Sequence, residues 1–215
     1  MAKQTTALPA YENITLRGGE EALHQLDRFF MKIDAVHATV HSLAKKLDEL
    51  GIPYAIAGAM ALNAHGFQRA TVDVDVLVTE VDLRRIHREL EGLGYVPPFV
   101  GSKNLRDTRT TVRIDFLIAG QFPGDGKPKP VAFPEPNDAA VTIEGIHYLG
   151  LPPLVELKLA SGMTNAGRLK DLGDVQELIR VLSLKRDFAS NLNPFVQAKY
   201  LELWDGVASS PEEER

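Results

Sequence analysis

The chain has 215 residues, of which 44% are hydrophobic, which is enough for one sizeable core with a helical extension. Its formal net charge of -5 does not favour non-specific coating of nucleic acid, although a local basic patch is compatible with a nucleic-acid substrate. The absence of cysteine excludes disulfides, thiolate metal sites and cysteine nucleophiles.

The chain begins with a polar stretch, residues 1–18, which we interpret as a loose arm. It has no apolar signal core, and no run in the chain is long enough to cross a bilayer. We therefore expect a soluble, cytoplasmic protein without a membrane partner. Apolar residues then recur at three- and four-residue steps and predict a helix over residues 20–50, with a break near His37–His41. The stripe comprises Leu23, Leu26, Phe29, Phe30, Ile33, Val36, Val40, Leu43, Leu47 and Leu50.

Residues 51–150 predict a small mixed β-sheet with flanking helices. Gly51 ends the first helix, and the region rich in Pro, Gly and Lys over residues 120–140 predicts a surface loop. We expect the strand over 110–119 to pair with the region around Tyr95. The predicted elements are a strand over 54–57, a helix over 59–64, a strand over 72–78, a helix over 82–92, a strand over 110–119 and a strand over 141–149 with a turn at 144–145.

The C-terminal third is predicted to be helical. After Pro152-Pro153 the pattern indicates helices over residues 154–161, 169–184 and 193–204, followed by a solvated tail over 209–215. The fold class is α+β, a small mixed sheet flanked by helices with a helical C-terminal part. We divide the chain into residues 1–50, 51–150, 151–208 and 209–215.

The stretch Val72-Asp73-Val74-Asp75-Val76 alternates acidic and apolar residues. In a strand, Asp73 and Asp75 face the same side about 6.6 Å apart, and the three valines face the core. Aspartate is rare in strands and like charges on one face repel, so a cation should offset them. Magnesium, which prefers oxygen ligands, is the natural candidate. An ordinary strand with one wet face is the alternative interpretation.

A third acid, Asp115, lies in the strand predicted over residues 110–119. Its face is shared with Arg113 and Leu117, and the other face carries apolar residues. If this strand neighbours Val72–Val78, three carboxylates can hold two metal ions roughly 3.5–4 Å apart.

The turn before the acidic strand suits a phosphate. Gly58 lets the backbone approach a ligand closely, and a helix that starts there presents unpaired N–H groups. Arg69 can pair with phosphate oxygens, and Thr71 precedes the acids. The simpler alternatives are a glycine that only ends the strand and an arginine in a surface salt bridge.

Charged residues also gather in the C-terminal helices. Lys158 can neutralise charge on a triphosphate, with Arg168 or Lys170 adding to it, although a solvated helical face is the usual explanation. A further basic set is either an acceptor surface or a solvated rim. This set comprises Lys103, Arg106, Arg109, Arg113, Lys127 and Lys129.

The turn Ala57-Gly58-Ala59 with Arg69-x-Thr71-x-Asp73-x-Asp75 resembles the polymerase-β-like nucleotidyltransferase superfamily, and within it the AbiEii-type proteins, which include toxins of toxin–antitoxin systems. The resemblance is specific over Ile52–Val78 and moderate over Leu154–Leu178. It implies that Asp115 is the third acid. It also implies a role for Lys158 and for Asp171 or Asp174, in orienting basic groups or assisting the acceptor. Where the superfamily turn commonly reads Gly-Ser, this chain has Gly58-Ala59 and lacks the serine hydroxyl.

The function we expect is transfer of a nucleoside monophosphate from a nucleoside triphosphate to an acceptor, with release of pyrophosphate. The expected cofactor is Mg²⁺, two ions, or Mn²⁺. The acceptor is RNA such as tRNA, a protein, or a small molecule such as an aminoglycoside, and a cognate antitoxin is a further expected partner. The expected catalytic and metal-binding residues are Asp73, Asp75 and Asp115, the nucleotide-binding residues are Gly58, Ala59, Arg69, Thr71, Lys158 and Arg168, and the accessory residues are Asp171 and Asp174.

Two alternatives stay open from the sequence. One is a catalytically weak or inactive protein of this fold that binds a partner or a nucleotide, which the missing serine favours. The other is a metal-dependent phosphohydrolase that uses the same acids.

Overall fold

The computed structural model describes residues 20–209, with side chains from residue 34 onward. The predicted N-terminal arm and the tail beyond Ser209 lie outside the described residues, as do the side chains of the predicted helical stripe from Leu23 to Ile33. The elements in chain order are α2 (Glu20–Glu49), β1 (Ala55–Ile56), α3 (Gly58–Ala64), β2 (Asp73–Val78), α4 (Glu80–Leu90), β3 (Tyr95–Val96), β4 (Leu105–Asp107), β5 (Arg113–Ile118), α5 (Pro136–Ala139), β6 (Ala140–Ile143), β7 (Ile146–Leu149), α6 (Leu151–Thr164), α7 (Leu169–Val181) and α8 (Pro194–Ser209).

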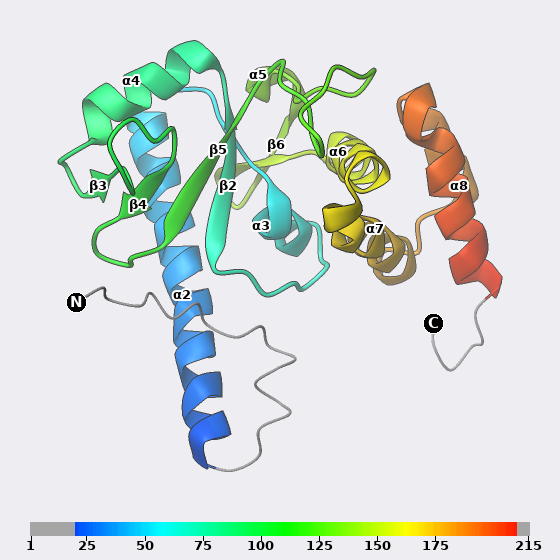
Figure 1. The fold of residues 1–215 in the computed structure, drawn as a ribbon, viewed down its shortest axis with the longest axis horizontal. Coiled ribbons are helices and arrows are strands. Elements are labelled where there is room, and N and C mark those ends of the chain that lie inside the picture. Colours follow the sequence, from blue (N-terminus) through cyan, green and yellow to red (C-terminus); the bar gives the residue numbers. More distant parts are fainter. Residues whose placement is uncertain (1–19, 210–215) are drawn as a thin grey trace.

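The described strands form one mixed sheet in the order β3-β4-β5-β2-β1-β7-β6. The pairs β2–β5 and β1–β7 are parallel, and the other neighbours are antiparallel. Figure 1 shows α2 and α4 beside the β3–β4–β5 end of this sheet, and α6, α7 and α8 at the other end of the molecule with α3 between. The α+β class and the helical C-terminal part are as predicted.

Helices α2 and α4 cover one face of the sheet. The His87 ring of α4 lies 6.4 Å from the ring of Phe116 on β5, and Ser42 of α2 is 3.4 Å from the Tyr95 hydroxyl on β3. Buried side chains on this face include Val74 and Val76. The acids of β2 and β5 alternate with these residues and therefore lie on the opposite face.

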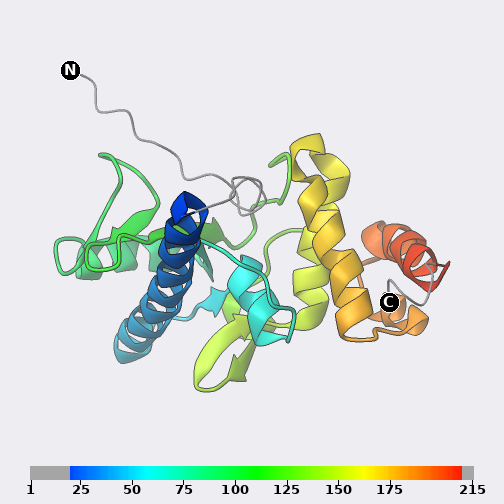
Figure 2. The ribbon, with the colours of Figure 1, turned by 90° about the horizontal axis from the view of Figure 1, so that it is seen from below.

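The C-terminal helices pack as a separate layer of the same core. Leu159 of α6 and Leu178 of α7 are fully buried, and Tyr200 of α8 is buried with its hydroxyl donating to the Lys185 carbonyl at 2.9 Å. Figure 2 shows α6 and α7 side by side with α8 beyond them, and α3 between this layer and α2. The packing brings α6 and α7 to the end of the sheet that carries β1 and β7.

Two predictions about the sheet are wrong. Val72 does not face the core: 48% of its surface is exposed, because β2 begins only at Asp73. Tyr95 does not pair with the strand over 110–119, because β4 lies between β3 and β5. The three-residue strand β4 is not anticipated by any alternating pattern.

Three predictions about helices also need correction. Helix α2 runs without a break at His37–His41, where both histidines are exposed and compatible with a helix. Helix α6 begins at Leu151, so that Pro152 and Pro153 lie in its first turn, where a missing N–H has no helical partner to lose. The region predicted as loop contains the short helix α5. Over the described residues, no helix has the length and apolar character that crossing a membrane requires.

Candidate active site

The three predicted acids lie on two neighbouring parallel strands. In the β2–β5 register, Asp75 is directly opposite Asp115, and Asp73 is opposite Arg113. Cross-strand partners share a face, so all three carboxylates belong to the face that α2 and α4 leave uncovered. Each of the three is partly exposed, while the residues between them, Val74 and Ile114, are fully buried.

Asp75 and Gly58 fit closely against each other. Gly58 has φ of +58°, and a Cβ built on it would lie 2.0 Å from the Asp75 Oδ2 atom. Only glycine therefore allows α3 to start at this point, and the Ala57 N–H donates to the Asp75 carbonyl at 2.8 Å. Burial, followed by the negative charges of Asp73 and Asp115, raises the pKa of Asp75 to about 6, against the opposing effect of Lys158 and Arg168.

Asp73 and Asp115 each have a partner in this structure. The Thr71 hydroxyl donates to Asp73 Oδ1 at 2.6 Å, and Arg113 Nε donates to Asp115 Oδ1 at 2.6 Å. Thr71 thus positions an acid, where the sequence suggested a nucleotide contact. Arg113, two residues before Asp115, lies on the face that the alternation predicted for it, and its side chain pairs with that acid.

The acid set fits a divalent cation in its chemistry. All its donors are carboxylate oxygens, which magnesium prefers, and the repulsion that raises the Asp75 pKa is what a cation would relieve. Among the described residues, no three carboxylate or imidazole side chains already converge as a formed metal site. The existing contacts of Asp73 and Asp115 are therefore ones that a cation would rearrange.

Arg69 links the segment before β2 to helix α7. Its Nη1 lies 2.9 Å from Asp174 Oδ2. The Asn63 side chain holds the Arg69 backbone at both ends, accepting from its N–H at 2.5 Å and donating to its carbonyl at 3.0 Å. Of the two roles considered from the sequence, a phosphate contact or a salt bridge, the structure shows a salt bridge, and that bridge is partly buried.

Lys158 is buried between two carboxylates of α7. Its Nζ donates to Asp171 Oδ1 at 3.1 Å and to Asp174 Oδ2 at 2.5 Å. Asp171 also accepts from Ser161 and from Arg168 Nε, each at 2.8 Å. Burial alone would raise the pKa of Asp171, but Lys158, Ser161 and Arg168 together lower it.

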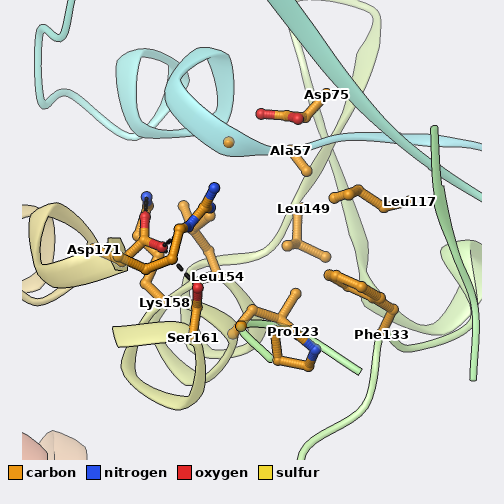
Figure 3. A pocket seen from close by; sticks show the side chains of 14 residues that line it. Ala57, Asp75, Leu117, Pro123, Phe133, Leu149, Leu154, Lys158, Ser161 and Asp171 are labelled. Carbon is orange, nitrogen blue, oxygen red and sulfur yellow. Dashed lines mark hydrogen bonds and ion pairs between the residues drawn. The ribbon is translucent and has the colours of Figure 1, made fainter. Parts of the chain in front are cut away.

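A pocket of about 100 Å³ lies between Asp75 and this lysine cluster. Figure 3 shows Asp75 and Ala57 on one side, Lys158, Asp171 and Ser161 on another, and Phe133 and Pro123 on a third. Its charged and hydroxyl lining comprises Asp75 on the sheet side and Lys158, Ser161, Arg168 and Asp171 on the side of the C-terminal helices. The apolar lining comprises Leu117, Pro123, Phe133, Leu149, Leu154 and Leu157.

Sequence reasoning assigned no role to Ser161 or to the apolar wall. A signal for Ser161 existed, because it is polar in an apolar helix and lies three residues after Lys158, on the same helical face. Phe133 and Pro123 lie in the predicted loop and offered no pattern. Lys129, whose side chain is only 6% exposed, holds Pro123 by donating to its carbonyl and to Asp125, each at 2.6 Å. Lys129 therefore does not belong to an open basic surface. Phe133 is held by backbone hydrogen bonds with Gly120 and Gln121, each at 2.8 Å.

Comparison with known proteins gives weak matches. No protein-family model matches the chain, and no curated protein matches it. A solved structure described as "putative nucleotidyltransferase from H. pylori" matches with a TM-score of 0.46 and 16% identity, over 84% of this chain and 93% of that chain. A second, described as "a putative nucleotidyltransferase" from Thermotoga maritima, matches with a TM-score of 0.38 and 14% identity, over 66% of this chain and 93% of that chain. At these values the functional assignment rests on the residues of this chain.

Proposed function

We propose that this protein is a metal-dependent nucleotidyltransferase that moves a nucleoside monophosphate from a nucleoside triphosphate to an acceptor. The observation that carries the proposal is the arrangement of the acids. Asp73, Asp75 and Asp115 occupy one sheet face on neighbouring parallel strands. Asp75, beside the glycine turn, lines a pocket whose other wall holds Lys158 and Arg168. Anionic and cationic walls around one pocket suit a phosphate chain with bound cations.

The three aspartates would hold Mg²⁺, two ions, with Mn²⁺ as a substitute. Such ions would neutralise charge on the phosphates and on the leaving group. The acceptor hydroxyl oxygen attacks the α-phosphorus, the bond to the bridging oxygen breaks, and pyrophosphate leaves. The proton of the acceptor hydroxyl passes to Asp115. Catalysis comes mainly from positioning and charge stabilisation.

Lys158 and Arg168 would contact the β- and γ-phosphates, together with backbone N–H groups of the Gly58-Ala59 turn. The volume of the pocket supports only part of this role, since about 100 Å³ is less than the roughly 300 Å³ of a typical ligand cavity. It would therefore take one part of the nucleotide, with the remainder lying along the open sheet face.

For the acceptor we propose RNA such as tRNA, or a protein. With an AbiEii-type assignment the protein would act as a toxin and would have a cognate antitoxin. The resemblance in sequence over the glycine turn and the acids supports this finer assignment.

Transfer assays test the proposal. Purified protein is incubated with each α-labelled nucleoside triphosphate, Mg²⁺, and total cellular RNA and protein. Label is expected on RNA or protein with the wild type and a loss of at least a hundredfold with Asp73→Asn. Asp34→Asn, an exposed acid on α2, is the matched control and should transfer normally. Unchanged transfer by Asp73→Asn would remove the acids from the mechanism.

A second candidate is a protein of this fold that binds a partner or a nucleotide without turnover. Ala59 favours it, since this residue is 8% exposed and brings no hydroxyl to the turn. Absence of label with all four triphosphates, together with a stoichiometric protein complex, would support this candidate.

A further inference from the structure

A row of side chains extends from the acids across four strands to the edge of the sheet. The register places Asp73 opposite Arg113, Arg113 opposite Arg106, and Arg106 opposite Val96. Cross-strand partners lie on the same face, so Val96, Arg106 and Arg113 share the face of the three acids. Figure 1 shows β3 and β4 at the end of the sheet remote from α6 and α7.

This row is open to solvent in the part of the chain that the structure describes. Arg106 is exposed, 52% of the Arg113 side chain is exposed, and Val96 is 39% exposed. The neighbours of Arg106 in β4, Leu105 and Asp107, are buried on the opposite face. Strands β3, β4 and β5 therefore have one buried face and one solvent-exposed face. The exposed face is continuous with the face that carries the three acids.

The two arginines of this row can bind an anion. Arg106 and Arg113 are directly opposite each other on antiparallel strands, an arrangement in which like charges repel. Arg113 gives its Nε to Asp115, and Arg106 gives one Nη to the Thr111 carbonyl at 2.8 Å. Each contact uses one of five guanidinium donors, so both side chains keep donors for phosphate oxygens. Lys103 and Arg109, on either side of β4 in the sequence, are also exposed.

We propose that Arg106 and Arg113 dock the phosphodiester backbone of a nucleic-acid acceptor on this face. Neighbouring strands are about 4.8 Å apart, so Arg106 lies two strand spacings, roughly 10 Å, from Asp73. A chain bound along the row presents its end to the acids. Because the net charge of the chain is -5, we expect nucleic acid to bind at this face and not over the rest of the surface. This inference rests on the proposed function, because it supplies the acceptor of that reaction.

The test measures binding without catalysis. Fluorescence anisotropy of a 5′-fluorescein 12-nucleotide single-stranded RNA, and of DNA with the same sequence, is recorded between 50 and 200 mM salt without triphosphate or metal. The double variant Arg106→Gln/Arg113→Gln should bind at least tenfold more weakly, with a salt slope smaller by about 1.4, because each phosphate contact on a single strand contributes about 0.7. Arg106→Lys/Arg113→Lys should stay within about threefold of the wild type, because the charge is kept.

Two further variants control for structure. Arg84→Gln/Arg88→Gln removes the same charge from exposed positions on α4, against the opposite face, and should bind as the wild type does. Arg113→Gln alone leaves the Arg106–Thr111 bond intact and should lose about half of the salt slope that the double variant loses. This single variant therefore tests the proposal even if the double variant does not fold.

Absence of nucleic-acid binding by the wild type, or an equal loss in the α4 double variant, overturns the docking proposal. So does transfer of label to protein and not to nucleic acid, a result that leaves the nucleotidyltransferase function standing. Conversely, binding that depends on Arg106 and Arg113 in a protein without transfer activity would keep the docking face and remove the proposed reaction.

Discussion

Asp75 is the residue on which burial and like charge act together. It lies beside Gly58, opposite Asp115 and two residues from Asp73, and its pKa is raised from 3.8 to about 6. Near neutral pH Asp75 is ionised, and the ionised carboxylate makes the folded state less stable than a neutral side chain at this position would. In the absence of a cation, this site reduces the stability of the fold.

The pH dependence of stability follows from that shift. Because the folded-state pKa is the higher one, the folded state binds more protons between pH 4 and 6, and stability falls as the pH rises through this window. Asp75→Asn removes the effect. Without metal at pH 8 the variant should be more stable by on the order of 3 kcal/mol, and near pH 4 the two proteins should converge. Urea unfolding at both pH values checks this, and equal stability at pH 8 would contradict it.

Gly58 offers a second test at the residue scale. Gly58→Ala places a Cβ 2.0 Å from Asp75 Oδ2 in a backbone with positive φ, so it should destabilise the protein by about 2–4 kcal/mol and displace the carboxylate. Gly51→Ala is the matched control, since Gly51 has φ of +61° and nothing within 4 Å of the added Cβ. It should cost only about 1 kcal/mol. If both variants lose the same free energy of unfolding in urea, the contact of the added Cβ with Asp75 does not contribute to the destabilisation.

Much of this residue-scale pattern could be predicted. Alternation in a strand puts Asp73 with Asp75, and Arg113 with Asp115, because the period of two is a property of the backbone. The same rule gives the wrong result for Val72. Alternation predicts which face of a strand a side chain occupies, but it does not predict the residue at which the strand begins. The missing serine after Gly58 was equally visible, although its consequence depends on the ligand.

At the scale of elements, Lys158 fastens α6 to α7. Both of its acidic partners lie on α7, and Ser161 of α6 adds a hydrogen bond to Asp171. Buried charges of this kind are costly unless each has a partner. The same contacts that hold the helices together also keep an ammonium group at the pocket wall.

Lys158→Met should destabilise the protein by about 3 kcal/mol at pH 7, because it leaves two buried carboxylates short of a cation. The pKa of Asp171 is lowered, so its contribution is present above its unfolded pKa near 3.9 and is lost as the pH falls; the cost of the variant should shrink below about pH 4. Urea unfolding measures both values.

The triple variant Lys158→Met/Asp171→Asn/Asp174→Asn separates structure from function. It removes the two carboxylates that Lys158→Met leaves short of a cation, but it also breaks the Arg69–Asp174 and Arg168–Asp171 ion pairs. It should therefore recover part of the stability. Transfer should stay absent in both variants if Lys158 contacts phosphate. Recovery of transfer along with stability would assign Lys158 a structural role alone.

Long periodic elements were predictable, and short ones were not. The apolar stripe of α2 and the alternation of apolar residues in β2 and β5 each repeat over several residues, so they predict these elements. Strand β4 has three residues and draws its stability from the strands on either side, so no local pattern marks it. Its position decides that Arg106 lies beside Arg113.

At the scale of the whole molecule, the candidate site is shared between the sheet and the helical C-terminal part. The acids come from β2 and β5, and the cations from α6 and the turn before α7. The apolar wall comes from β5, β7, α6 and the loop after β5. Arg69 ties the two parts together through Asp174. Such long-range proximity could not be read from spacing along the chain, because it depends on how the helices pack.

A shared site predicts that ligand binding stabilises the entire protein in one transition. Mg²⁺ with a non-hydrolysable α,β-methylene triphosphate, at about 100 times its Kd, should add about 2.7 kcal/mol. For a chain of this length that raises the Tm by roughly 5–10 °C, measured by differential scanning fluorimetry. Asp73→Asn should lose the part of the shift that requires Mg²⁺, and Arg84→Gln should keep all of it. A shift that survives in Asp73→Asn would mean that the nucleotide binds without the acids, and the cationic wall around Lys158 would then account for binding on its own.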